Sequence, residues 1–479
     1  MLIRWGWSRS IGTSIRPFHA AAAISLLLAA TATPSLAGDE RKPGEPYPIT
    51  LEAALRLADE RNVEIALQIE EVKRAVLAHK DAYLEWLPTL RAGGSYARQN
   101  GALQETAGLV SDIDRDAQYS GLGVGALGSA APSLAGASLE IDFARAIFEP
   151  LVAKQRKLAS RAENEATRAR VFLEVAEAYY ALTRAHQSVG ITAQAKAEAR
   201  QLASVTGDFA ETGEGLLADA ERAAVESLLL EAEEEEARGD LALASSSLAR
   251  LLRLDDAVRL EPPGNYIIPL SMVDPGQSEE ECIARALVQR PELRAQHALV
   301  SAAHAALKEG KFGPFIPRLR GAYSYGDFRG GNRSGPTNSG DRHDIGVALY
   351  WQLDGLGFGQ YNAAQRRASE LREARLEKAQ TLSDIIAQVK SAHSQLTSAD
   401  RRLGITRRTI VRARKAHELN RERVFENQGL PLESLQAMQA LATAERLHLR
   451  AATDFNTSQL RLHTAMGSHL RSALDPAEP

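Results

Sequence analysis

Two eleven-residue segments of the chain are close copies of each other. "WLPTLRAGGSY" (Trp86–Tyr96) and "FIPRLRGAYSY" (Phe315–Tyr325) keep Pro, Leu, Arg, Ser and Tyr in register, 229 positions apart. The preceding stretches, "EAALRLADERNVEIALQIEEV" from Glu52 and "EECIARALVQRPELRAQHALV" from Glu280, share apolar positions at helical spacing. A repeat of this length predicts that one structural unit is built twice. The fold must therefore consist of two similar halves.

In each half the apolar period changes from helical to alternating at a proline, Pro88 or Pro317. Alternation with period 2 predicts strands near 90–97 and 318–326, and returning strands near 136–144 and 344–353. The polar, Gly-rich stretches between them, roughly 98–135 and 328–342, are predicted to be loops. Each returning strand has one apolar face and one that could line water, although a single such strand also fits a soluble sandwich.

Long helical stretches follow the strands. The first is predicted from Pro150 to about Phe209 and resumes from Leu217 to about Leu254; the second runs from Gln360 to about Asn427 and on to about Met466. The breaks predict hairpin tips near 210–218 and 427–433. A helix from Ala153 to Phe209 would reach about 85 Å and cannot fit a globule. It must lie in a bundle or coiled coil.

The N-terminus has the pattern of a secretory signal. Arg4, Arg9 and Arg16 precede an apolar run at 20–32, which predicts a signal peptide over 1–37. The repeats are then expected at 38–255 and 278–467, with a linker at 256–277 and a tail at 468–479. The single cysteine, Cys282, excludes an intramolecular disulfide and a lipid on a mature N-terminal cysteine.

Composition and motifs point away from catalysis. With a net charge of −4 and 44% hydrophobic residues, the chain is neither a disordered protein nor a nucleic-acid binder. "GLGVGALG" has glycines at dinucleotide-site spacing but no leading strand or following helix. Glu445 with His448, and His297 with His304, lack further ligands. We therefore predict no catalytic, cofactor or metal site, and a protein that is not an enzyme.

Four strands per chain cannot close a barrel, and lipid tolerates no open strand edge. If the apolar faces meet lipid, several chains must share one barrel. Two copies would give eight strands, which a small barrel fills with its own side chains, and three would give twelve, with room for a pore.

The chain resembles the TolC family of outer-membrane efflux proteins over essentially its whole mature length. The family pieces are a helix start, an "LP" before the first strand and glycine-containing tips; here they read Leu51, Ala54, Ala58, Asn62 and Glu64, then Leu87 and Pro88, then "TGEGLLAD" and "QGLPLESL". There are departures: Val63 replaces the usual Pro in the first copy, and Arg290 replaces Asn in the second.

The resemblance implies a mainly α fold with a small membrane β-barrel. It is a duplicated subunit with two strands and one long helical hairpin per half. Three copies form a twelve-stranded channel in outer-membrane lipid, with a helical tunnel in the periplasm. The implied function is the passive exit duct of a tripartite efflux or type I secretion system. A periplasmic adaptor (membrane fusion protein) would couple it to an inner-membrane pump or ABC exporter.

The resemblance also implies which residues meet these partners. The hairpin tips would dock the adaptor, through Thr212, Gly213, Leu216, Asp219, Gly429, Leu430 and Leu432. Acidic side chains near the same end, Asp208, Glu211 and Asp219, could ring the pore and favour cations. An aromatic belt is predicted at Trp86, Tyr323, Tyr325, Tyr350 and Trp351. Simple turn chemistry at the glycines and sheet packing of the aromatics are the alternative explanations.

A rival interpretation is a soluble periplasmic coiled-coil adaptor or scaffold. An adaptor usually has one hairpin rather than two matched halves, and the alternating strands would remain unexplained. A periplasmic helical metal enzyme is a third possibility, for which the ligand set is missing.

Overall fold

The computed structural model describes residues 46–104, 106–122, 137–213, 215–255, 258–264, 267–332, 338–425, 431–468 and 470. All of them belong to one compact unit, Gly44–Pro479. The predicted signal peptide lies outside these residues. Among the helices in the described ranges, none has an apolar stretch long enough to cross a membrane.

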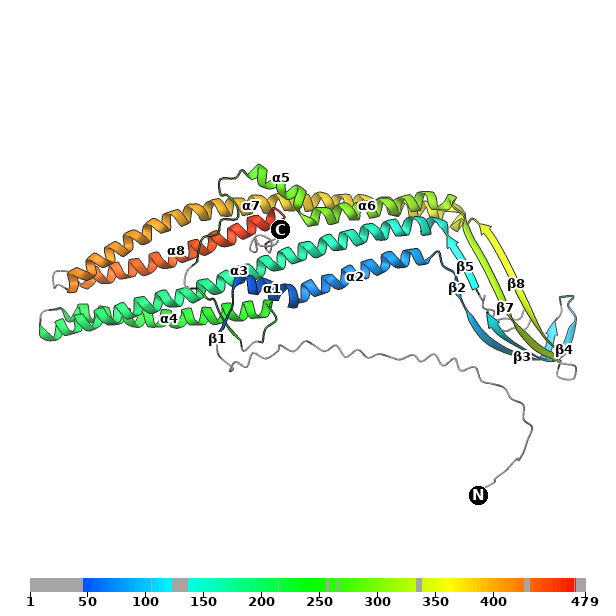
Figure 1. Cartoon of the computed structure of the whole chain (residues 1–479), viewed down its shortest axis with the longest axis horizontal. Helices are drawn as coiled ribbons and strands as arrows, with labels where there is room; N and C mark the ends of the chain where they lie inside the picture. Colours follow the sequence, from blue (N-terminus) through cyan, green and yellow to red (C-terminus); the bar gives the residue numbers. More distant parts are fainter. Residues whose placement is uncertain are drawn as a thin grey trace, which may run out of the picture. The chain divides into compact units, whose positions relative to one another are not determined.

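Each half contains four helices in the same order (Figure 1). In the first half they are α1 (Leu51–Arg61), α2 (Val63–Leu84), α3 (Phe143–Thr212) and α4 (Leu217–Leu251). In the second they are α5 (Glu279–Gln289), α6 (Pro291–Phe312), α7 (Phe358–Phe425) and α8 (Pro431–Ala465), with short 3₁₀ turns η1 (Gly313–Phe315) and η2 (Asp354–Gly357).

The opening stretch of each half, which has apolar positions at helical spacing, forms two helices separated by a break. The break falls at Asn62 and at Arg290, both extended at ψ 127° and 122°. Asn62 Oδ1 accepts the backbone N–H of Glu64 at 2.9 Å and so caps α2. Arg290 makes no cap, but Pro291 starts α6 at the position where a missing N–H costs least. The new helix is thus started by a side-chain cap in the first half and by a first-turn proline in the second.

The two break residues also make equivalent long-range contacts. Asn62 Nδ2 donates to the carbonyl of Leu251 at the end of α4, at 3.3 Å. The guanidinium of Arg290, which is 8% exposed, donates to the carbonyl of Ala465 at the end of α8, at 3.4 Å. A helix end leaves carbonyls without intrahelical partners. The departure at Arg290 therefore preserves the function of the asparagine that it replaces.

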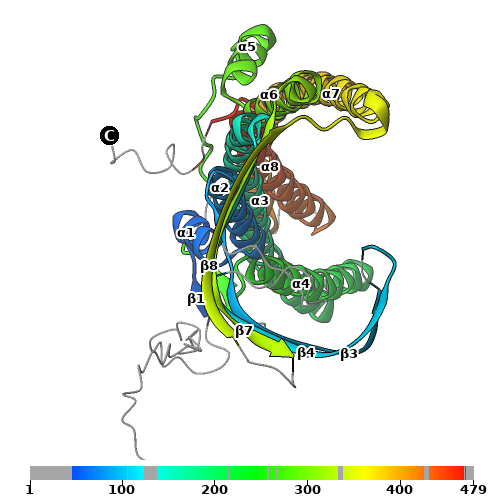
Figure 2. The ribbon, with the colours of Figure 1, turned by 90° about the vertical axis from the view of Figure 1, so that its right-hand side faces the viewer.

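The six longer helices form one layer, with α1 packed on α3 and α5 packed on α7 outside it. α3 packs along α4 over one part of its length and along α2 over another, and α7 does the same with α8 and α6. α3 also packs on α6 and α8, which joins the halves. The layer is curved, with α4 and α7 at its two margins (Figure 2). Alanines dominate the buried faces, and small side chains allow the close approach of such long helices.

α3 begins at Phe143, seven residues before the predicted start at Pro150. Asp142 caps it by accepting the backbone N–H of Arg145 at 3.1 Å. Pro150 therefore lies inside the helix and cannot donate to the carbonyl of Ala146. The indole Nε1 of Trp86 donates to that carbonyl instead, at 3.3 Å. This external donor explains how the helix tolerates the proline.

The main sheet contains β2 (Thr89–Leu90), β3 (Ala92–Gln104), β4 (Val110–Leu122), β5 (Ala137–Asp142), β7 (Arg318–Asn332) and β8 (Asn338–Tyr350), all antiparallel. Its order is β2-β5-β7-β4-β3, with β8 on the other side of β7. β5 pairs with β7 over Arg318–Tyr323 and β4 pairs with it over Tyr325–Asn332. β4 and β5 thus occupy consecutive lengths of one sheet position, as do β2 and β3. The sheet has four strand positions.

The predicted loops at 98–135 and 328–342 are wrong over much of their length, because β3, β4, β7 and β8 extend into them. In β3 and the outer parts of β7 and β8, polar residues occupy both faces, and in β4 Arg115 interrupts an apolar face formed by Ile113, Ala117 and Tyr119. Cross-strand pairs hold these strands instead: Arg98 contacts Asp114 at 3.3 Å and Arg115 donates to Gln99 at 2.6 Å. Residues 143–144 of the predicted returning strand are in α3, and 351–353 lie beyond the end of β8.

The segment between the halves is fixed to the helices. β6 (Arg259–Glu261) pairs in parallel with β1 (Pro46–Pro48). Beyond it, two fully buried amides of α8 bind the chain. Asn456 accepts from the backbone of Leu270 and donates to Ile268, both at 2.8 Å; Gln459 accepts from Val273 at 2.8 Å and donates to its carbonyl at 2.9 Å. The described part of the predicted linker at 256–277 is thus attached to the helices rather than free of them.

We predict that Gln459→Leu releases this segment locally. The substitution keeps the volume but leaves the backbone groups of Val273 without partners, at a cost of about 1–3 kcal/mol. Hydrogen exchange should show strongly faster exchange at Val273, with little change in the tip region. Thr457→Ala is the matched control, because Thr457 donates only to carbonyls of its own helix. Unchanged exchange at Val273 in Gln459→Leu would contradict the assignment.

Candidate functional site

The strand register gives the sheet two different faces. Opposite one another across β5, β7 and β8 lie Ile141, Leu319 and Leu349, and one step along the same face lie Leu139, Gly321 and Val347. The alternate positions pair Glu140, Arg320 and Ala348, then Asp142, Arg318 and Tyr350. Along these stretches of β5, β7 and β8, one face is therefore apolar and the other carries charges. Ile345 and Val347 are 79% and 74% exposed, so nothing in the described part of the chain covers the apolar face there.

The sheet also has two open edges within the described residues. β2 and β3 form one edge and β8 the other, and neither pairs on its outer side. An unpaired edge presents free N–H and C=O groups. These groups need a partner, because an exposed edge in lipid has no water to bond with.

Of the aromatic residues predicted as a belt, Trp86, Tyr350 and Trp351 lie where strands meet helices, and two lie within β7. Tyr323 and Tyr325 are on β7, and Tyr350 ends β8 and donates to Glu140 at 3.1 Å. Trp86 and Trp351 flank the strands rather than lying in them, and both donate to a backbone carbonyl, Trp351 to Phe315 at 3.3 Å. These bonds give each tryptophan a structural role in its junction. The membrane belt stays a prediction.

One sheet residue was missed by the sequence analysis. Tyr119 on β4 is 3% exposed, and its hydroxyl lies 3.1 Å from the carbonyl of Leu122 and 3.2 Å from that of Tyr325. Its ring fills the space above Gly326, where a Cβ would come within 2.5 Å of it. Gly326 is therefore required by packing. The contact between Tyr119 and Gly326 cannot be predicted from a local sequence pattern, because the two residues are far apart in sequence.

The first hairpin tip is a tight, glycine-dependent turn. α3 ends at Thr212, and Gly213 follows in the left-handed region at φ 80°. The backbone N–H of Gly215 donates to the carbonyl of Phe209 at 2.8 Å, and a Cβ on Gly215 would lie 2.9 Å from the Phe209 side chain. Leu216 starts α4 without a side-chain cap and is 69% exposed. The turn thus presents a bare apolar side chain at the end of the hairpin.

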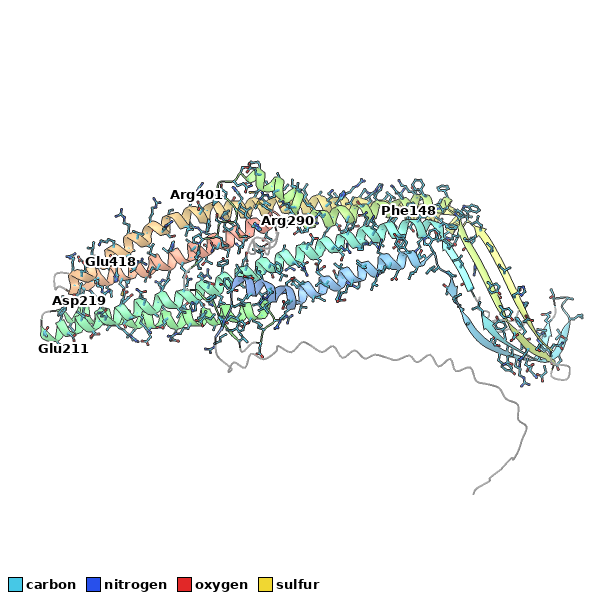
Figure 3. All side chains as sticks on the ribbon, viewed as in Figure 1. Phe148, Glu211, Asp219, Arg290, Arg401 and Glu418 are labelled. Atoms are coloured by element: carbon cyan, nitrogen blue, oxygen red, sulfur yellow. The ribbon has the colours of Figure 1, made fainter. Side chains whose placement is uncertain are left out.

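The acidic residues predicted near the pore differ in environment. Asp208 and Glu211 are on the last turns of α3, and Glu211 is exposed. Asp219 is half-buried and lies 3.5 Å from Arg222. Figure 3 shows Glu211 and Asp219 at the same end of the α3–α4 hairpin. The carboxylate of Glu211 is therefore open to solvent, and that of Asp219 is partly neutralised.

The two tips meet through α4 and α8. A small gap is lined by Asp219, Arg222 and Ala223 from α4 and by Pro431, Leu432 and Leu435 from α8. Leu435 belongs to a buried cluster with Leu202 of α3 and Val424 of α7. Gly429 and Leu430 lie outside the described residues. The structure thus brings Leu432 close to the first tip.

A cavity of about 1390 Å³ lies between α3, α4 and the start of the inter-repeat segment on one side and α7 and α8 on the other. Its lining includes Glu445 and His448, the pair noted in the sequence analysis. Glu445 lies 3.3 Å from Arg414, and His448 lies 3.2 Å from the Thr406 hydroxyl. Burial lowers the pKa of His448, which favours a neutral ring. These contacts account for both residues without a ligand.

Comparison with known proteins identifies the fold. The structure matches that of the Campylobacter jejuni CmeC outer membrane channel (TM-score 0.71, 15% identity, covering 90% of both chains). It matches VceC from Vibrio cholerae (0.68, 17%, 88% of this chain and 96% of that one) and the open state of Neisseria gonorrhoeae MtrE (0.66, 17%, 88% and 89%). No curated protein matches the sequence. At these identities the likeness establishes the fold, which is that of a TolC-like outer-membrane channel.

Residues 282–468 match the family model described as outer membrane efflux protein. The resemblance to the TolC family is therefore confirmed, with the mainly helical fold that it implied. The second half of the chain thus matches the outer membrane efflux protein family, and the described chain has the fold of TolC-like outer-membrane channels.

We predict a specific coupling between Trp86 and Pro150. Trp86→Phe keeps the packing on Phe143, at 6.0 Å between ring centroids, but removes the donor to Ala146. It should lower the free energy of unfolding in urea by about 1 kcal/mol. In a Pro150→Ala background the effect should largely vanish, because an alanine at this position would supply the missing intrahelical N–H. Equal losses in both backgrounds would contradict this account.

Proposed function

We propose that three copies of the chain form the passive exit duct of a tripartite efflux or type I secretion system in the outer membrane. The observation that carries the proposal is a sheet with two open edges whose part next to the helices has one apolar face and one charged face. With the apolar face in lipid, β8 of one copy would pair with β2 and β3 of the next. Four strand positions from each of three copies would give a twelve-stranded barrel with a polar lumen.

In this arrangement the helical layers continue the lumen as a tunnel in the periplasm. The curvature of the layer in Figure 2 supports this arrangement, since three such layers side by side would enclose a space. The hairpin tips would form its far end. There the exposed Leu216, Leu217 and Leu432 offer apolar contacts to a periplasmic adaptor, which would link the duct to an inner-membrane pump or ABC exporter.

The remaining site residues take roles consistent with this function. Thr212, Gly213 and Asp219, with Gly429 and Leu430, complete the docking tips. The carboxylates of Asp208 and Glu211 would favour cations at the entrance.

The lipid face is tested by two adjacent substitutions. Val347→Lys places a charge on the apolar face, at a cost of about 2–4 kcal/mol if it meets lipid. Gly346→Lys is its control on the other face, where a Cβ meets nothing within 4 Å. We expect Val347→Lys to be depleted from the salt-washed outer-membrane fraction and Gly346→Lys to be retained. If both variants, and the parent chain, wash off as soluble proteins, the periplasmic scaffold replaces the channel.

Docking is tested at the tips. Gly213→Arg combined with Gly429→Arg should abolish export while leaving trimers intact, because the bulky charges block tip contacts without touching the sheet. Gly190→Arg is the control, since it adds the same side chain in open space on α3. Full export by the double variant would exclude these turns as the docking site.

A further inference from the structure

The two faces of the sheet differ in the sign of their charge. The face that carries Arg320 and Glu140, here called the charged face, holds five arginines and three acids in the described strands, as alternation and the cross-strand pairs place them. They are Arg91, Arg115, Arg318, Arg320 and Arg342, with Glu140, Asp142 and Asp344. In the outer part of the sheet the opposite face carries two arginines and five aspartates, namely Arg98, Arg329, Asp112, Asp114, Asp116, Asp327 and Asp341. The sheet thus sorts basic and acidic side chains by face.

Two of the three acids on the charged face are neutralised by arginines of the same face. The carboxylate of Asp142 lies 2.8 Å from the guanidinium of Arg318, and the carboxylate of Asp344 lies 2.8 Å from the guanidinium of Arg342. These two ion pairs add no net charge. The positive excess of the face therefore comes from its other arginines.

Arg91 and Arg320 are exposed and make no ion pair within the described residues. Arg91 donates to the hydroxyl of Ser138 at 3.2 Å. Arg320 lies opposite Glu140 in the register of β5 and β7, but the carboxylate of Glu140 accepts the hydroxyl of Tyr350 at 3.1 Å instead. A guanidinium has five N–H donors in a planar fork that matches carboxylate and phosphate groups. Both arginines therefore keep donors for a further anion.

The two arginines lie close to one level of the sheet, next to the helices. Arg91 contacts Ser138 on β5, and Arg320 is opposite Glu140, two residues further along that strand. At about 3.3 Å per residue, their levels differ by roughly 7 Å. β5 ends at Asp142, where α3 begins. Both guanidinium groups thus lie near the end of the sheet that joins the helices.

In the proposed barrel these arginines would occupy alternate strand positions. Arg91 lies between β2 and β3, in the first of the four positions, and Arg320 lies on β7, in the third. Three copies would place an arginine at every second position around the wall, with neighbours about 10 Å apart. Glu140 lies on β5, in the second position. Each copy thus contributes two arginines and one glutamate, so the ring keeps a positive excess.

We infer that Arg91 and Arg320 form an anion-binding girdle in the lumen, where the barrel joins the helical tunnel. The solutes that it recognises carry a carboxylate, sulfonate or phosphate group. Charge of one sign on the wall of a confined lumen raises the local concentration of solutes of the opposite sign. The inference rests on the proposed channel and adds the class of solute that its barrel attracts. The acids near the hairpin tips lie at the other end of the molecule (Figure 1), so they do not neutralise the girdle.

Block by a polyanion tests the girdle in the detergent-extracted full chain, reconstituted in planar bilayers. The recordings use 0.1 M KCl, where charges are screened over about 10 Å. Inositol hexakisphosphate, added on the side to which the barrel opens, should block the current of the parent channel. Arg91→Gln with Arg320→Gln should raise the half-blocking concentration by roughly tenfold, because it removes the positive excess of the ring. Arg320→Gln alone, which removes a side chain without an ion pair, should already raise it.

The matched control is Arg98→Gln with Arg329→Gln. It makes the same two changes in the same sheet, but on the opposite face, which would look away from the lumen. Block of this variant should equal that of the parent. Arg91→Lys with Arg320→Lys keeps the charges and should also remain sensitive to block.

Ion selectivity gives a readout that needs no bound probe. Under a KCl gradient, Arg91→Gln with Arg320→Gln should lower the ratio of chloride to potassium permeability by at least about twofold, and the control should leave this ratio unchanged. Glutamine variants that keep the block and the permeability ratio of the parent would overturn the girdle while leaving the channel proposal intact. A parent chain that forms no channels would overturn the channel proposal itself.

Discussion

The backbone groups at the edges of the sheet are the constraint from which the rest of the structure follows. β8 on one side and β2 with β3 on the other leave N–H and C=O groups unpaired within the described residues. They lie next to a sheet face on which Ile345 and Val347 are exposed. In water such an edge invites aggregation, and in lipid it is prohibitively costly. Both problems are solved when copies of the chain pair edge to edge. Closure of the sheet then dictates that the helices attached to it also meet at their margins.

The junction between sheet and helices transmits this geometry. At each junction a tryptophan donates to a backbone carbonyl, Trp86 to Ala146 and Trp351 to Phe315. Arg318 on β7 adds an ion pair with Asp142, at 2.8 Å, which ties the second half of the sheet to the cap of α3. These contacts lie within one chain and tie the strands to the helices on both sides of the junction.

Much of the architecture was predictable because its signals are periodic. The apolar faces of β5 and β8 alternate clearly, and the long helices lack interruptions, so the element types could be predicted. β4 was missed because Arg115 interrupts its apolar face of Ile113, Ala117 and Tyr119, and the pairing with β3 and β7 is what shows the strand. The start of α3 was misplaced because Pro150 is usually a first-turn residue, whereas here a distant indole replaces its missing N–H. Such long-range compensation leaves no local pattern.

The site was predictable to a smaller extent. The tip glycine Gly213 could be recognised from its local sequence, but the contact of Leu432 with the first tip depends on tertiary packing.

The central claim is that the open sheet of one chain closes only with copies of itself. The most direct test is the subunit count of the detergent-extracted protein by native mass spectrometry. The account predicts three copies, which supply twelve strand positions and leave no edge unpaired. A stable monomer in the same detergent would contradict it, because the unpaired edges of β8 and β3 would then have no partner.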